Sequence, residues 1–257
     1  MAVIKYLPGK KSLTSQLKYL LDEEKTLDKL KSGVNCGTDN LEKEFNVVKD
    51  MYNKNKGKQY YHYVQAFSKS DVLTPEKAHE IGREWICKSI KGHQTYIITH
   101  IDKEHIHNHF IINSVNLENG KKLQISPRKL EKMKIESNKI CERENLSVID
   151  LNKKAEKRIT TAEYRIEKRG KETWKSELRD VIELELRNSS NLEEFRRNLK
   201  EKYEVETRVT KSTISYKHPK CNKSVRGNKL GAIYVKEYIE NEFNKQRNRK
   251  DCERNEA

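Results

Sequence analysis

Residues 96–115 have the sequence Y-I-I-T-H-I-D-K-E-H-I-H-N-H-F-I-I-N-S-V, and this stretch decides the fold. It contains four of the eight histidines of the chain, at positions 100, 105, 107 and 109. Runs of apolar, strand-forming residues stand before and after these histidines. A short turn at residues 102–104 predicts a β-hairpin, which brings His100 beside the histidines of the following strand.

Three histidines of this hairpin can meet at one metal ion. Side chains alternate between the faces of a strand, so His105, His107 and His109 share a face, with neighbours about 6.5–7 Å apart. All three would span about 13 Å, so one ion takes His107 with either His105 or His109. We favour His109 because it adjoins the apolar run that anchors the strand, and His105 then remains an alternate ligand or a supporting residue. Asp102 is expected to orient a ligand imidazole by accepting its second N–H.

His100 completes this set from the neighbouring strand. Three imidazoles that leave coordination positions open suit metal-assisted chemistry better than a closed structural site. The alternative is a histidine-rich surface turn, which the two apolar strands beside the histidines make the weaker interpretation.

Composition indicates a polyanionic partner. The 257 residues carry a formal net charge of +15, with 36% charged and 34% hydrophobic residues. A balance this basic points first to nucleic acid. We find no signal peptide or apolar run that could span a membrane, so we expect no membrane insertion. The five cysteines are scattered without a C-x-x-C pattern, which fits a reducing, cytoplasmic environment.

Residues 1–150 are expected to form one α/β domain of the α+β kind, with an antiparallel central sheet flanked by helices. The tight turn between the two histidine-bearing strands supports the antiparallel arrangement. An exposed loop is expected at residues 27–37. The other predicted elements are strands at residues 2–7, 59–67 and 123–125 and helices at residues 12–21, 41–52, 74–91 and 126–145.

Composition changes near Asp150, and residues 151–257 predict a charged helical linker followed by a small, mostly helical basic region that contacts DNA. A helical stripe is expected from Trp174, Leu178, Val181 and Leu184. A hairpin is predicted at residues 203–216 and a last helix at about 231–243. The basic loop between them offers Arg226 and Lys229 as candidate DNA contacts, with a simple solvated loop as the equal alternative.

Three motifs together resemble one family, the relaxases or mobilization nucleases, and most closely the P-type group of Gram-positive mobile elements. They are L-K-Y-L-L-D-E-E-K at residues 17–25, Y-H-Y-V-Q-A-F-S at residues 61–68, and H-I-D-K-E-H-I-H-N-H-F-I-I-N at residues 100–113. The first maps the nucleophilic tyrosine of the family onto Tyr19. The third maps its histidine pattern onto His100, His107 and His109 and its final asparagine onto Asn113. The resemblance covers residues 3–149 well and the remainder weakly.

The resemblance implies an HUH-endonuclease fold and a conjugative relaxase. Such an enzyme nicks one DNA strand at a transfer origin with a divalent ion, here Mn²⁺ or Mg²⁺. Attack by Tyr19 gives a 5′-phosphotyrosyl link that is rejoined after transfer. The implied partners are single-stranded and hairpin DNA, accessory relaxosome proteins and a type IV coupling protein. Lys25 and Tyr63 are candidate DNA contacts.

Several alternatives stay open. Tyr6 and Tyr52 compete as nucleophiles. Three acidic residues at positions 22–24 are candidates for proton removal, although solvation of a helix end is the favoured role. Within tyrosine–histidine nucleases, a rolling-circle replication initiator or a transposase would carry the same motifs. A non-catalytic, metal-stabilised DNA-binding protein is the alternative from another class.

Overall fold

The computed structural model describes residues 3–7, 12–22 and 24–255. The chain forms two compact units, Met1–Leu151 and Asn152–Ala257, and each has a hydrophobic core of its own. Within the described ranges no helix combines the length and the apolar content needed to cross a membrane.

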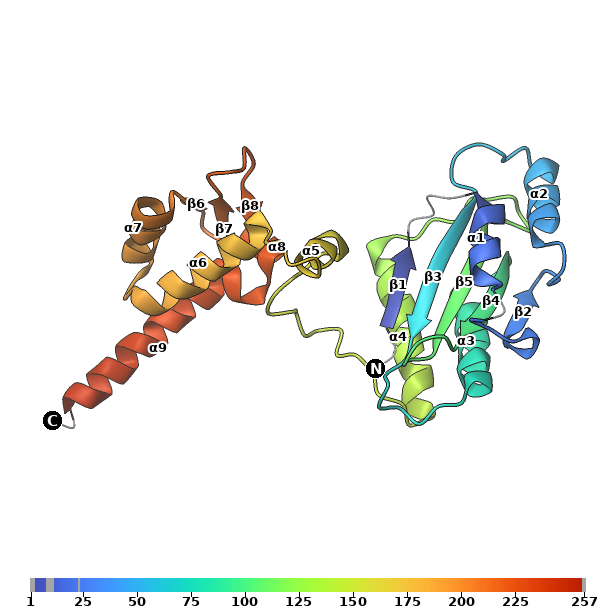
Figure 1. Ribbon diagram of the computed structural model, residues 1–257, viewed down its shortest axis with the longest axis horizontal. Coiled ribbons are helices and arrows are strands. Elements are labelled where there is room, and N and C mark those ends of the chain that lie inside the picture. The colour runs from blue at the N-terminus through green and yellow to red at the C-terminus, as the bar shows by residue number, and fades with distance from the viewer. Residues whose placement is uncertain (1–2, 8–11, 23, 256–257) are drawn as a thin grey trace. The chain divides into compact units, whose positions relative to one another are not determined.

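The first unit is built on a five-stranded sheet with the order β1-β3-β5-β4-β2, in which every neighbouring pair is antiparallel (Figure 1). All residues of the two central histidine-bearing strands are buried. This confirms the predicted antiparallel α/β fold. In chain order the strands are β1 (Val3–Leu7), β2 (Lys31–Val34), β3 (Tyr60–Ala66), β4 (His93–His100) and β5 (His107–Asn116).

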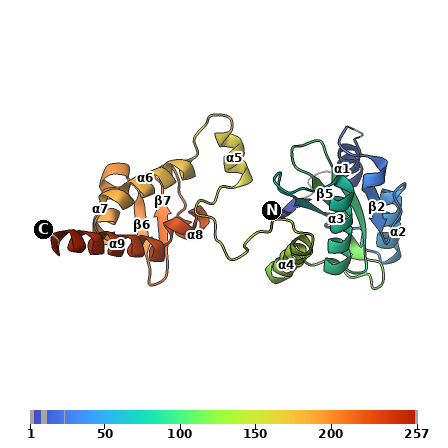
Figure 2. The ribbon, with the colours of Figure 1, turned by 90° about the horizontal axis from the view of Figure 1, so that it is seen from below.

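Helices cover both faces of this sheet, as the two views in Figure 1 and Figure 2 show. Helices α1 (Leu13–Leu20) and α2 (Leu41–Met51) pack on one face, and α3 (Pro75–Ser89) and α4 (Pro127–Arg143) pack on the other. The hydroxyl of Ser12 caps α1 by accepting a hydrogen bond from the backbone N–H of Ser15. Burial on both faces explains the continuous apolar runs inside these two strands, at residues 96–98 of β4 and residues 110–112 of β5.

A chain of buried polar side chains crosses the sheet on the α3 and α4 face. The Thr99 hydroxyl donates to Asn108 Oδ1 at 2.7 Å, so it accepts from His79 Nδ1 at 2.8 Å. His79 Nε2 is then left to accept from the Ser32 hydroxyl at 2.7 Å. The Asn108 amide donates to Gln65 Oε1 at 3.1 Å. Because Thr99 lies directly opposite Asn108, these bonds fix the register of β4 against β5 beside the histidines.

Two predictions of local structure in the first unit are wrong. Residues 28–34 are not a loop but a short 3-10 helix, η1 (Asp28–Leu30), followed by the edge strand β2, with Leu30 fully buried. The sequence K-S-G-V lacks the alternation of a strand and becomes one by pairing with β4. The strand expected at residues 123–125 is absent, and only the preceding residue, Lys122, forms an isolated bridge, with Val115.

The second unit packs three helices, α6 (Trp174–Asn188), α7 (Leu192–Tyr203) and α9 (Lys236–Asn255), with a three-stranded antiparallel sheet. The predicted stripe is wrong at Leu184, which is 45% exposed, whereas Ile182 is buried in the core. The remaining elements are α5 (Thr161–Glu167), β6 (Glu206–Val209), β7 (Ile214–Lys217), β8 (Val225–Arg226), α8 (Gly227–Leu230) and the 3-10 helix η2 (Ala232–Tyr234).

Candidate metal and tyrosine site

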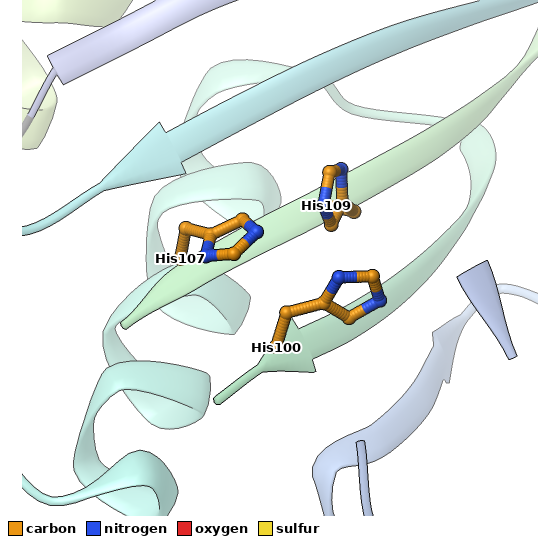
Figure 3. A group of neighbouring side chains, drawn as sticks. All are labelled: His100, His107 and His109. Carbon is orange, nitrogen blue, oxygen red and sulfur yellow. The ribbon is translucent and has the colours of Figure 1, made fainter. Parts of the chain in front are cut away.

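Three histidines converge on the α1 face of the central sheet (Figure 3). His100 ends β4 and lies directly opposite His107, the first residue of β5, while His109 follows two residues later on the same face. One ligand nitrogen from each ring lies within 4.8 Å of the other two. The structure therefore brings His109, rather than His105, together with His100 and His107.

The protein engages one nitrogen of each ring. His100 donates from Nε2 to the carbonyl of Leu20 at 2.8 Å, and His107 donates from Nδ1 to the carbonyl of His105 at 3.2 Å. Because a carbonyl oxygen can only accept, these bonds fix the tautomers. They leave Nδ1 of His100 and Nε2 of His107 with a free lone pair. His105 thus contributes its main chain and is itself half-buried.

Burial keeps the three imidazoles neutral. It lowers the pKa of His107 to about 4, and it lowers the pKa of His100 and of His109 as well. Neutral imidazole is the form that binds metals, so protons do not compete for this site near pH 7. The donor set of three nitrogens on two adjacent strands could hold a divalent transition-metal ion and leave coordination positions for a substrate.

Tyr19 lies on α1, one residue before the Leu20 carbonyl that accepts from His100, and its side chain is 51% exposed. The Nζ of Lys25 stands 4.5 Å from the centroid of the Tyr19 ring. The Lys25 carbonyl also accepts from the backbone N–H of Ile101 at 2.9 Å, which joins the segment after α1 to the end of β4. The structure thus places the candidate nucleophile and Lys25 together and ties both to the histidine-bearing hairpin.

Of the acidic residues after Tyr19, Asp22 has contacts that weaken it as a base. Asp22 pairs with Lys25 and accepts from the backbone N–H of Glu24, and the Lys25 bond in particular lowers the Asp22 pKa. A carboxylate with a lowered pKa is a weaker base, which favours the helix-end role over proton removal. Glu23 lies outside the described residues.

The two competing tyrosines have engaged hydroxyls. Tyr6 accepts from Lys58 Nζ at 2.9 Å, and Tyr52 donates to the Leu117 carbonyl at 3.0 Å. Neither tyrosine has a hydrogen bond to the three histidines within the described part of the chain.

Two of the predicted supporting residues have no hydrogen bond to a ligand imidazole among the described residues. Asp102 Oδ1 is 4.0 Å from Nδ1 of His100, beyond hydrogen-bond distance, and the second N–H of that ring goes to the Leu20 carbonyl, so Asp102 is not the acceptor that we expected. The Asn113 amide instead donates to the Phe45 carbonyl at 3.1 Å and to Gln94 Oε1 at 2.9 Å. Asn113 therefore holds α2 against the sheet.

Tyr63 is not a DNA contact in this structure. Its side chain is 2% exposed and packs at 5.3 Å between ring centroids against Tyr6, in the core under α3 and α4. A base cannot stack on a ring that the core covers. By contrast, Arg226 and Lys229 are both exposed in the second unit.

One histidine beside this site, His62 on β3, was not predicted from the sequence. Its Nε2 lies 2.8 Å from Nδ1 of His109, and its side chain is buried. Burial lowers the pKa of His62 to about 4. His62 is separated from His109 by 46 residues, and only the pairing of β3 with β5 brings the two rings onto one face.

The chain is similar to known proteins over most of its length. Residues 19–146 match the family model described as relaxase, MobA/VirD2-like, nuclease domain. Two proteins of Staphylococcus aureus named "Protein rlx" are 40% and 41% identical over 213 residues, which are 83% and 82% of this chain. The "Group II intron-interrupted relaxase LtrB" of Lactococcus lactis subsp. cremoris (strain MG1363) is 33% identical over 171 residues, 60% of this chain and 28% of that protein.

The staphylococcal relatives are longer proteins. The chain spans about two thirds of their length, 66% and 67%. A solved structure described as "Molecular Basis of Vancomycin Resistance Transfer in Staphylococcus aureus" aligns at 17% identity over 58% of this chain and 72% of that chain, with a TM-score of 0.33, which is too low for an argument about the fold. The matched family region begins at Tyr19 and includes the whole histidine hairpin, and with relatives of up to 41% identity this chain belongs to the MobA/VirD2-like relaxase family.

Proposed function

We propose that this chain is a conjugative relaxase, an enzyme that nicks one DNA strand at a transfer origin and later rejoins it. The observation that carries the proposal is the hydrogen bond from His100 to the Leu20 carbonyl, at 2.8 Å. It holds the helix that bears Tyr19 against one of the three candidate metal ligands, so nucleophile and metal site belong to one constellation.

Tyr19 would act as the nucleophile. Its phenolic oxygen forms a bond to the scissile phosphorus as the bond from phosphorus to the 3′ oxygen breaks. The phenolic proton is lost to solvent, and the departing 3′ oxygen takes up a proton. One phosphodiester replaces another, so the free 3′-OH can reverse the step and rejoin the strand without another energy source.

The three histidines would hold a divalent ion. When bound, such an ion supplies Lewis-acid polarisation of the phosphate and a template for in-line attack. Of the two predicted ions we favour Mn²⁺, because Mg²⁺ prefers oxygen ligands and the donor set is entirely imidazole nitrogen. The neutral rings need no deprotonation at pH 7 to serve as ligands.

DNA would be held by the basic surface. The net charge of +15 favours phosphate contacts, and Lys25, whose Nζ lies beside the Tyr19 ring, would contact the scissile strand. Arg226 and Lys229 are exposed in the second unit for further contacts. We also propose single-stranded and hairpin origin DNA as the substrate, accessory relaxosome proteins and a type IV coupling protein as partners, and the bacterial cytoplasm as the location.

The test is a nicking assay with the full chain, Mn²⁺ and an oligonucleotide from the transfer origin of its own element. A covalent adduct mapped to Tyr19 by mass spectrometry supports the proposal. Cleavage only at a replication origin or an element end would assign the chain to an initiator or a transposase. Tight DNA binding without any adduct would make it a non-catalytic binding protein.

A further inference from the structure

We infer that His62 is a positioning residue, which holds the ring of His109 in the orientation that binds the metal. The inference rests on the proposed metal site and adds a fourth histidine that is not itself a ligand. The two rings lie 2.8 Å apart between His62 Nε2 and His109 Nδ1, with centroids separated by 5.1 Å. Both side chains are buried, so water does not compete for this hydrogen bond.

The direction of the bond follows from the chemistry of His109. For His109 to bind a metal through Nε2, that atom must carry a free lone pair, and the ring proton then resides on Nδ1. His109 Nδ1 therefore donates, and His62 Nε2 accepts. This fixes the tautomer of both rings and increases the basicity of the ligand nitrogen, as a hydrogen-bonded partner of a metal-bound histidine does.

His109 differs from the other two ligands in the kind of partner it has. His100 and His107 donate to main-chain carbonyls, which no substitution at the partner residue removes. The hydrogen-bond partner of His109 is instead a side chain, that of His62. The orientation of His109 is thus the part of the site that a single substitution can release.

The position of His62 in the sheet makes it a rigid partner. Val64 on β3 lies directly opposite His109, so His62, two residues earlier, shares the face of that ring. His62 itself pairs with Leu7 on one side and with Ile111 on the other. A partner fixed on both sides by strands holds a ligand more accurately than one on a loop. The competing role, a fourth metal ligand, would require His62 to turn its Nε2 away from His109.

The experiment measures Mn²⁺ binding to the full chain by isothermal titration calorimetry. His62→Leu removes the acceptor, and we expect its affinity for Mn²⁺ to fall about 10–100-fold. His62→Gln keeps an acceptor oxygen near the position of Nε2 and should restore affinity to within about threefold of the unsubstituted protein. The matched control is His93→Leu, because His93 is a buried histidine of the same sheet that bonds the Asn113 carbonyl at 2.9 Å. The His93→Leu variant should bind Mn²⁺ with the affinity of the unsubstituted protein.

Two results would overturn the inference. Unchanged affinity in His62→Leu would show that His62 does not position the ligand. A loss in His62→Gln as large as in His109→Ala would show that His62 is a ligand. If the unsubstituted protein fails to bind Mn²⁺, the metal site itself is wrong, a failure that is separate from either of these. Thermal unfolding of the metal-free variants identifies any that are misfolded.

A second inference comes independently from the three-stranded sheet of the second unit. Arg208 on β6 lies directly opposite Ser215 on β7, which lies directly opposite Arg226 on β8. The flanking residues Ile214 and Tyr216 enter the core, so this row faces away from it. Both arginines are exposed, and in the described chain neither guanidinium has a hydrogen-bond or ion-pair partner.

We propose that this row binds the phosphate backbone of a DNA duplex. The neighbouring carboxylate, Glu206, is neutralised by Lys217 at 3.1 Å, so it does not offset the two arginines. Strands lie about 4.8 Å apart, which separates the two arginine backbones by about 10 Å, the length of about three nucleotides of one DNA strand. Without an aromatic residue, the row offers no platform for unpaired bases, which favours duplex over single-stranded DNA.

This inference rests on the proposed function, and its test separates the two. Fluorescence anisotropy gives the affinity of the full chain for a duplex that flanks the nick site, over a range of salt. The double variant of Arg208→Ala and Arg226→Ala should reduce the salt slope by about two, near one for each lost contact. Arg197→Ala removes an exposed charge from α7 of the same unit and should change the slope little. Adduct formation at a short single-stranded nick site is measured on the unsubstituted protein, and its absence would contradict the proposed function without bearing on the row. A slope in the double variant equal to that of the unsubstituted protein, or a similar drop in Arg197→Ala, overturns the row as a site.

Discussion

His100 donates a hydrogen bond from Nε2 to the main-chain carbonyl of Leu20, at 2.8 Å, and so joins the end of β4 to the last residue of α1. The final carbonyls of a helix have no partner within the helix, and this one is satisfied by a candidate metal ligand. The backbone next to Tyr19 is fixed by the same ring that would hold the metal.

Substitution of Tyr19 by phenylalanine should abolish the covalent DNA adduct while DNA affinity and thermal stability stay close to those of the unsubstituted protein. The ring is 51% exposed, so loss of its hydroxyl costs little in folding. The assay is denaturing gel electrophoresis of protein with labelled origin DNA. Tyr52→Phe, which loses a hydrogen bond to Leu117, is the matched control and should still form the adduct. An adduct in Tyr19→Phe would exclude Tyr19 as the nucleophile.

The bond between His100 and Leu20 can be tested without DNA or metal. His100→Phe removes the donor, and the last turn of α1 should then open more often, with amide hydrogen exchange at residues 17–21 about 2–10-fold faster. His107→Phe removes a candidate metal ligand whose hydrogen bond goes to the His105 carbonyl rather than to Leu20, and it should leave that exchange unchanged. Equal rates in both variants would show that the bond does not stabilise the helix.

The local pattern around the histidines was predictable because it depends on neighbours in sequence. Strand alternation and a short turn suffice to place His100 beside His107. The residues that were missed or misassigned depend on contacts between segments that are far apart in the sequence. Tyr63 lies in a strand that helices cover on both faces, so alternation could not show that its ring is enclosed. The partner of His62 lies 47 residues later in the chain, and β2 becomes a strand only through its pairing with β4.

The metal-free first unit should lose stability as pH falls from about 6.5 to about 4. Burial lowers the pKa of His62 and of His107 from 6.5 to about 4. Between these values the unfolded chain binds protons that the folded chain excludes, so the free energy of unfolding decreases with decreasing pH, and the contribution of these two histidines is lost in full below about 4.

Urea unfolding in EDTA at pH 7 and pH 5 measures this effect. Fluorescence of Trp85, which is buried in the first unit, reports the unfolding of that unit when Trp174 of the second unit is replaced by phenylalanine. The variant His62→Gln should show a smaller decrease, since one of the buried titrating groups is gone. Stability that is equal at the two pH values would mean that the buried histidines remain accessible to protons.

Two threonines of β4 give the sharpest test of the polar chain behind the site. Thr99 and Thr95 lie on one face of the strand, and both are fully buried. The Thr99 hydroxyl accepts from His79 and donates to Asn108, whereas the Thr95 hydroxyl has no hydrogen-bond partner among the described residues. Thr99→Val leaves two buried polar atoms unpaired and should lower the free energy of unfolding by about 1–3 kcal/mol. Thr95→Val removes an unpaired hydroxyl from the same environment and should be neutral or stabilising. Because strand, substitution and burial are shared, urea unfolding of the two variants isolates the hydrogen bonds, and an equal loss in both would mean that the polar chain contributes nothing beyond packing.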